Sequence, residues 1–142
     1  MTGPRILAAA YAAILAVVAS LNYLPIPGLV DEAGLTFGIF ALDPFDDALH
    51  AVSALWAGWA AWRSHKAAEF FCLSFGFLYL ADGALGMLTG WGYLDLAICF
   101  NASLGADFGL FRWLANLPHL GLGGLALAVG LRSLFAREPV PA

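Results

Sequence analysis

The sequence predicts an all-α membrane protein, a bundle of four transmembrane helices, and two observations support this fold class. Hydrophobic residues make up 62% of the chain and charged residues only 11%, whereas soluble domains average about half apolar and a quarter charged. A transmembrane helix needs about 20 apolar residues, and four stretches have that length: 6–24, 44–62, 68–91 and 113–135. We therefore expect a single transmembrane domain over residues 1–142.

The first stretch, residues 6–24, follows the single basic residue Arg5. A basic residue, an apolar run and small residues near its end are also the pattern of a secretory signal. We expect this segment to be retained as the first span. All four runs are too long for transmembrane β-strands of about 10 residues, and they do not alternate, so helices are favoured over a barrel.

The second stretch begins with "DPFDDALH", Asp43 to His50. Asp43 followed by Pro44 predicts an N-cap and a first helical residue. Asp46 stands at the capping-box position, and both Asp46 and Asp47 suit the positive end of a helix dipole. Capping does not explain His50, which lies about 9 Å along the helix from Pro44 at about 1.5 Å per residue. We expect its imidazole below the headgroups.

The third stretch carries Asp82 in "LYLADGALG". A carboxylate inside the membrane costs ~2.5–3.5 kcal/mol on insertion scales and normally faces a partner or a water-filled cavity. The neutral form of Asp82 is one escape from this cost, and a histidine partner is the other. We expect Tyr79, one helical turn earlier, to donate a hydrogen bond to Asp82. The start of the fourth helix stays open: Asn116 and Pro118 begin it, or it begins near Trp113 and Pro118 kinks it.

An internal repeat links the second and fourth stretches. "FGIFALDPFDDALH" (37–50) is echoed by "FGLFRWLANLPH" (108–119), and in each copy an Asp or Asn precedes a histidine by three residues: Asp47 with His50, Asn116 with His119. We expect two duplicated helical hairpins. Small residues follow each histidine at helical spacing, and we expect the second and fourth spans to pack along these stripes, bringing the histidines together. The stripes are Ala54, Ala57 and Ala61, and Gly123, Ala126 and Gly130.

Basic residues predict the orientation, because they stay on the cytoplasmic side of a membrane. One side of the four spans holds Arg5, Arg63, Lys66, Arg132 and Arg137, whereas the other holds only Arg112 and most of the acidic residues. Both termini are therefore expected in the cytoplasm, with residues 25–42 and 92–112 outside. We expect a multi-pass protein of the bacterial inner membrane.

The candidate functional site is a polar cluster in the outer half of the bundle. It comprises His50, His119, Asp82, Asp47, Asn116 and Tyr79. The chain has no nucleotide-binding or hydrolase motif and no Cys/His metal-binding spacing, which argues against an enzyme. We expect a non-enzymatic structural or accessory membrane subunit without a cofactor. It would contact the lipid bilayer and other membrane subunits or a second copy of itself, and no nucleic acid.

Three alternatives to this purely structural role remain open. His50 and His119 would be the ligands of haem b or a metal ion, if the protein binds one. The same histidines with Asp82 would carry protons or ions across part of the membrane. The third alternative is a pocket for a lipid, a quinone or another hydrophobic ligand.

Three motifs resemble a bacterial family of small four-helix membrane proteins catalogued as a domain of unknown function. The resemblance covers roughly residues 37–131, in "FGIFALDPFDDALHAVSALWAG", "FGFLYLADGALG" and "LPHLGLGGLALAVG". The family's Asn/Asp-x-x-His motifs match Asp47 with His50 and Asn116 with His119, and its span-three pattern matches Gly76, Tyr79 and Gly86. Pro118 and Asp82 depart from the family pattern. The resemblance implies the four-helix fold and no particular reaction.

Overall fold

The computed structural model describes residues 1–136 and is helical, with no β-strand in that range. Arg137, one of the basic residues used to predict orientation, lies outside the described residues. The long helices are α1 (Gly3–Ser20), α2 (Pro44–Arg63), α3 (His65–Thr89) and α5 (Leu110–Phe135). Three short turns complete the structure: 3-10 turns at Leu21–Tyr23 and Ala102–Leu104, and helix α4 (Ala97–Phe100).

Three helical segments are long and apolar enough to cross a membrane: Gly3–Tyr23, His65–Thr89 and Leu110–Phe135. The predicted class, a helical membrane protein, agrees with this finding. Helix α2 is not among the three. Its first two turns carry the polar residues Asp46, Asp47 and His50. A fourth span at α2 therefore stays a prediction.

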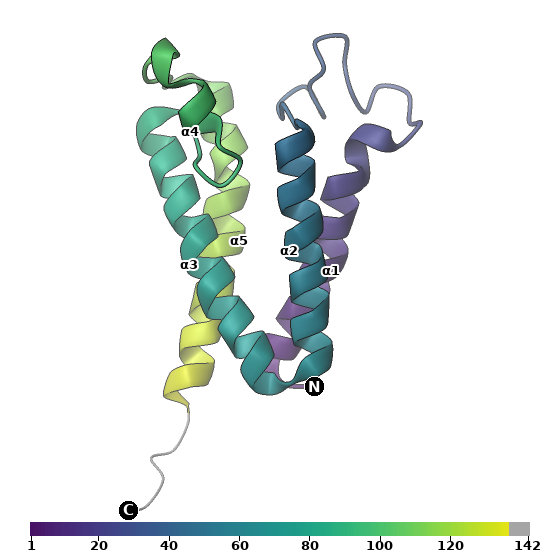
Figure 1. Ribbon diagram of the computed structural model, residues 1–142, viewed down its shortest axis with the longest axis vertical. Helices are drawn as coiled ribbons and strands as arrows, with labels where there is room; N and C mark the ends of the chain where they lie inside the picture. Colours follow the sequence, from purple (N-terminus) through teal and green to yellow (C-terminus); the bar gives the residue numbers. More distant parts are fainter. Residues whose placement is uncertain (137–142) are drawn as a thin grey trace, which may run out of the picture.

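The long helices form two pairs, α1 with α2 and α3 with α5. Figure 1 shows that the pairs converge at the end of the molecule that holds the N-terminus and diverge toward the other end. At the convergent end the extended residue Ser64 joins α2 to α3, and its hydroxyl oxygen accepts a hydrogen bond from the backbone N–H of Ala67 at 3.1 Å. One residue thus ends one helix and caps the next.

The two small-residue stripes do not meet, so the expected packing of the second span on the fourth is wrong. The backbones of α2 and α5 are not packed against each other. The α5 stripe instead packs within its own pair, and Gly58, next to the α2 stripe, lies against α1. A Cβ added to Gly58 of α2 would contact Ala12 of α1 at 3.6 Å, and Cβ atoms on Gly123 and Gly130 would collide with α3. Small residues allow close approach, but each helix uses them against its partner in the pair.

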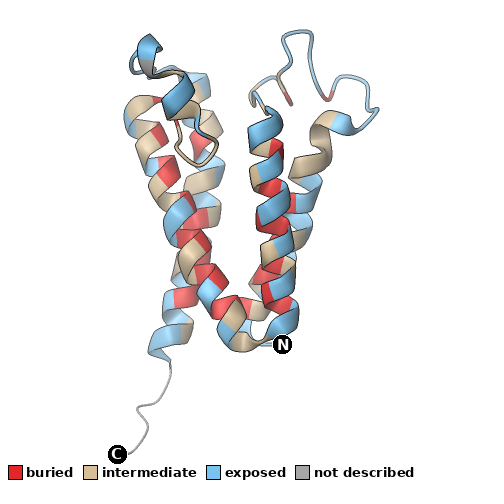
Figure 2. Cartoon of the chain, viewed as in Figure 1, coloured by how far each residue is buried: buried red, intermediate tan, exposed pale blue. Residues whose placement is uncertain are grey.

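An aromatic core closes the convergent half of the molecule. Tyr11 of α1 lies edge-on to Phe75 of α3 at 5.5 Å between ring centroids, and Phe71 stacks on Phe75 at 5.0 Å. The Tyr11 hydroxyl donates to the backbone oxygen of Leu122 in α5 at 2.8 Å, which ties the two pairs together. Figure 2 shows the buried residues on the facing sides of the helices. This core holds the convergent ends together while the divergent ends stay apart.

The predicted capping of α2 is confirmed. The Asp43 carboxylate accepts hydrogen bonds from the backbone N–H groups of Phe45 and Asp46, at 2.7 and 3.0 Å, and the Asp46 carboxylate accepts from the Asp43 N–H at 3.1 Å. Helix α5 begins at Leu110, so Pro118 lies inside it. Of the two starts that the sequence left open, the one near Trp113 is therefore correct, and the one at Asn116 and Pro118 is not.

Candidate functional site

A cavity of about 510 Å³ lies where the two helix pairs diverge, within the ~300–1,000 Å³ that small-molecule sites usually have. All four long helices contribute to its lining, as do the loop before α2 and the loop between α3 and α5. Most of the wall is apolar, with aromatic side chains from Phe40, Trp91 and Phe111. Its polar wall includes four of the candidate residues, His50, Asp82, Asn116 and His119, together with Asp46 of the capping box.

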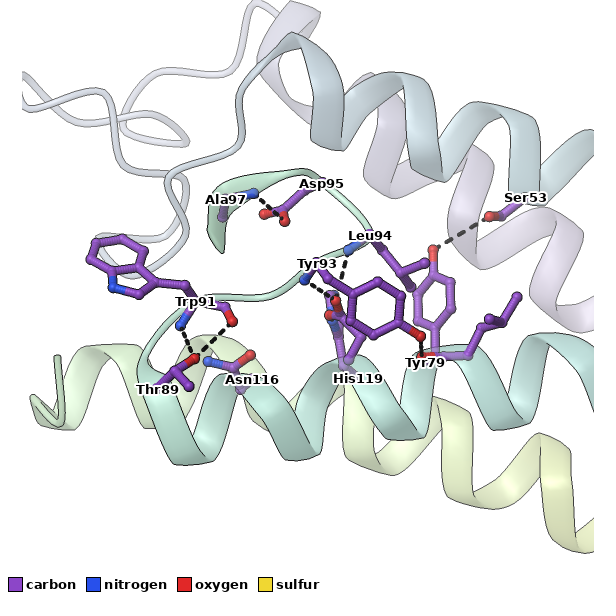
Figure 3. Close-up of polar contacts among 12 residues, drawn as sticks. Ser53, Tyr79, Thr89, Trp91, Tyr93, Leu94, Asp95, Ala97, Asn116 and His119 are labelled. Atoms are coloured by element: carbon purple, nitrogen blue, oxygen red, sulfur yellow. Dashed lines mark hydrogen bonds and ion pairs between the residues drawn. The ribbon is translucent and has the colours of Figure 1, made fainter. Parts of the chain in front are cut away.

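Asp82 is 1% exposed and has three hydrogen-bond partners. One carboxylate oxygen accepts from the backbone N–H groups of Tyr93 and Leu94, at 2.6 and 2.8 Å, and the other contacts Nδ1 of His119 at 2.5 Å. The loop after α3 therefore turns back into the molecule and presents two amides to the carboxylate (Figure 3). These donors satisfy a charge whose burial would otherwise be costly.

The expected histidine partner of Asp82 is His119, on α5. A carboxylate with two backbone donors on one oxygen acts as an acceptor, so the proton between the residues belongs to Nδ1 of the imidazole. The Tyr79 ring lies beside the imidazole at 5.1 Å between centroids. Nε2 of His119, on the opposite side of the ring from Nδ1, has no hydrogen-bond partner among residues 1–136.

His50 has a similar arrangement on α2. Its Nδ1 lies 2.7 Å from the backbone oxygen of Asp46. Because a carbonyl oxygen only accepts, Nδ1 is the protonated nitrogen. The residue is 7% exposed and lines the cavity, and its Nε2 has no hydrogen-bond partner in the described part of the chain.

The other three candidate residues serve the surrounding structure. Asn116 lines the cavity and donates to the Arg112 backbone oxygen at 2.8 Å. Asp47 lies outside the cavity lining and accepts from Asn22 at 3.1 Å. Tyr79 is also outside the lining, and its hydroxyl lies 3.4 Å from Ser53 and not against Asp82. The expected hydrogen bond from Tyr79 to Asp82 is therefore wrong.

The outer rim of the cavity carries one paired cation. Arg112 contacts the Asp107 carboxylate at 3.2 Å and lies over the Trp91 ring at 4.1 Å. The backbone N–H of Gly109 and the Arg112 side chain hold the pKa of Asp107 below its usual value. On the same loop, burial and the Asp82 charge raise the pKa of Tyr93.

The loop amides on Asp82 are the part of the site that the sequence did not predict. Any residue except proline can supply a backbone N–H, so residue types alone do not reveal these two donors. Gly92 provides an indirect signal, because a Cβ there would lie 2.9 Å from both carboxylate oxygens of Asp82. A glycine directly before Tyr93 and Leu94 lets the backbone approach the carboxylate.

A second polar cluster lies at the convergent end, around His65, and the sequence did not predict it. His65 contacts the Thr2 hydroxyl at 2.9 Å through Nδ1 and the Ser133 hydroxyl at 3.2 Å through Nε2. Ser133 donates its proton to the Glu69 carboxylate at 2.6 Å. The histidine therefore does not activate this serine as a nucleophile. The cluster instead connects α1, α3 and α5.

No group of three or more His, Cys, Asp or Glu side chains within residues 1–136 is arranged to hold a metal ion. Comparisons of the chain with protein-family models, curated proteins and solved structures found no match. The resemblance to the four-helix family therefore remains a prediction.

Proposed function

We propose that the chain is a four-span protein of the bacterial inner membrane that binds a small hydrophobic molecule, acting as a non-enzymatic accessory component of the membrane. One observation carries this proposal: the cavity of about 510 Å³ between the diverging helix pairs, with His50 and His119 among its lining residues. An apolar cavity with a few polar groups is the usual form of a small-molecule site.

The four-span topology is supported by the partnership of α2 with α1. The two helices run side by side (Figure 1). The polar side chains at the start of α2 find hydrogen-bond partners within α2 or in the residues that follow α1. The capping box supplies partners for the first turn of α2. His50 donates to its own helix, and Asp47 accepts from Asn22.

The distribution of charge supports cytoplasmic termini. Arg5, Arg63 and Lys66 lie at the convergent end, beside the N-terminus and the α2–α3 junction. The carboxylates of Asp46, Asp95 and Asp107 line the cavity at the divergent end. Since basic residues remain cytoplasmic, the cavity would lie in the outer half of the membrane. The predicted origin of the two pairs by duplication is compatible with this arrangement.

Binding of an apolar fluorescent probe to the purified, full-length chain in nanodiscs tests the proposal. We expect saturable binding, and native mass spectrometry should detect molecules of defined mass that co-purify with the protein. Ala115→Phe adds volume inside the cavity, whereas Leu88→Phe changes a side chain that is 71% exposed and outside the lining. We expect Ala115→Phe to weaken probe binding at least tenfold and Leu88→Phe to leave it unchanged. Equal binding by both variants and the parent would contradict the proposed site.

A further inference from the structure

The two histidines of the cavity offer the same kind of atom to a ligand. In each ring Nδ1 donates a hydrogen bond to an oxygen of the protein, the Asp46 carbonyl for His50 and the Asp82 carboxylate for His119. In a neutral imidazole with its proton on Nδ1, Nε2 is an acceptor. Neither Nε2 has a hydrogen-bond partner within residues 1–136. His50 is 7% exposed as a residue, and no fully buried side-chain nitrogen or oxygen among the described residues lacks a partner, so its Nε2 is accessible to a ligand.

The charges around the cavity disfavour an anionic ligand. Asp46 and Asp95 line it, and neither has a cation partner among the described residues. The lining cation Arg112 is already paired with Asp107. A fatty acid, an anionic headgroup or the propionates of haem would therefore meet carboxylates at this rim. A neutral ligand that donates hydrogen bonds fits the site better.

The shape and the lining narrow the ligand class further. The histidine-bearing helices α2 and α5 belong to different pairs, and their backbones are not packed against each other. A ligand between the pairs can therefore contact His50 on one side and His119 on the other. Phe40, Trp91 and Phe111 line the cavity and offer ring faces for packing. The rest of the wall, which includes Leu15 and Val18 of α1, suits an aliphatic tail.

We propose that the cavity binds a hydroquinone-type lipid, an aromatic ring whose hydroxyl groups donate hydrogen bonds to Nε2 of His50 and Nε2 of His119 while its alkyl or isoprenoid tail lies against the apolar wall. This inference rests on the proposed function and specifies the ligand of the same cavity. The Asp82 carboxylate lies directly behind His119, where it places a negative charge next to the ring that receives the phenolic hydrogen bond. The proposal concerns binding and includes no electron transfer.

The decisive experiment compares two ligands on the parent protein. Decyl-ubiquinol carries two phenolic protons, whereas its dimethyl ether has a similar ring and the same tail but no proton to donate. We expect the full-length chain in nanodiscs to bind the hydroquinone at least tenfold more tightly than the ether, under anaerobic conditions and by tryptophan fluorescence. Equal affinity for the two would overturn the hydroquinone proposal and leave the hydrophobic site intact. Binding of neither ligand, together with no binding of the apolar probe, would overturn both.

Variants then assign the contacts. His50→Phe and His119→Phe each remove one acceptor, and we expect each to abolish most of the preference for the hydroquinone over the ether. His65→Gln is the matched control, because the third histidine of the chain lies at the convergent end, outside this cavity. A preference that persists in both phenylalanine variants would overturn the assignment. A haem absorption band in the purified parent that disappears in both variants would also overturn it, in favour of bis-histidine haem ligation.

Discussion

Replacement of Asp82 tests the interior of the site most directly, because three donors converge on this one carboxylate. Asp82→Leu removes every acceptor while keeping a similar size. It leaves the amides of Tyr93 and Leu94, and Nδ1 of His119, without their partner. An unsatisfied buried donor costs about 1–3 kcal/mol, and here three donors lose their acceptor together. We expect Asp82→Leu to destabilise the protein by about 3–5 kcal/mol.

Asp82→Asn separates charge from hydrogen bonding. Its carbonyl oxygen can still accept from the two loop amides, but its NH₂ group is a donor that cannot accept the Nδ1 proton of His119. We expect a smaller loss, about 1–3 kcal/mol. A lipid-facing aspartate would behave in the opposite way, because leucine would then relieve a cost of ~2.5–3.5 kcal/mol.

Unfolding in mixed detergent micelles measures the free energies of the parent and both variants, and ¹⁵N-histidine NMR follows the Nδ1 proton of His119. We expect a strongly downfield Nδ1–H signal in the parent that moves upfield in both variants. A control is Asp31→Asn, because Asp31 is exposed and is not among the cavity-lining residues, and an asparagine oxygen can still accept from the backbone N–H groups of Ala33 and Leu35. A leucine variant as stable as the parent, with an unchanged His119 signal, would refute the carboxylate–imidazole pair and the loop anchor together.

Three further predictions concern topology, packing and pH. In a Cys99→Ser background, which removes the exposed native thiol, a cysteine at Asp31 should react with an impermeant thiol reagent from outside the cell and one at Lys66 only after permeabilisation; the reverse pattern would refute the orientation. Gly76→Ala should lower the free energy of unfolding by about 1–3 kcal/mol, because the added Cβ would lie 2.7 Å from the Cα of Leu127 in α5. The control Gly121→Ala should be tolerated, because a Cβ there would meet no atom outside its own stretch of helix within 4 Å. Backbone and arginine contacts lower the pKa of Asp107. The stabilising contribution of the Asp107 carboxylate should therefore be complete above the ordinary aspartate pKa of about 3.9 and disappear as pH falls through the lower pKa of the folded protein. Carboxyl ¹³C NMR should show this titration, and an Asp107 pKa at or above the ordinary value would contradict the prediction.

The helices and their caps were predictable from local sequence. The Asp43–Pro44 start of α2 depends on groups within one helical turn, so the residue types alone specify it. The partnership of Asp82 with a histidine was also predictable, since an ionisable group in an apolar helix needs a partner and few are present. The loop amides that complete the site were not, because any residue can supply a backbone N–H.

The choice of helix partners could not be derived from the stripes of small residues. A stripe shows that a helix is approached closely, but not by which neighbour. Gly123 and Gly130 face α3, and the α2 stripe belongs to a core that it shares with residues of α1 and α3. Had α2 packed on α5 through these residues, the histidine-bearing helices would have been in contact. Their separation leaves the space in which a ligand fits.

The two histidines differ in what their loss would mean. His119 is coupled through Asp82 to the loop after α3, so its replacement disturbs the roof of the cavity as well as the cavity wall. His50 donates only to a carbonyl of its own helix, which keeps its backbone partners without the imidazole. A change at His50 therefore removes an acceptor from the cavity while leaving the anchored loop in place. Ligand affinity in the His50 variant is for this reason the more specific measure of recognition, and stability in the His119 variant is the measure of the Asp82 anchor.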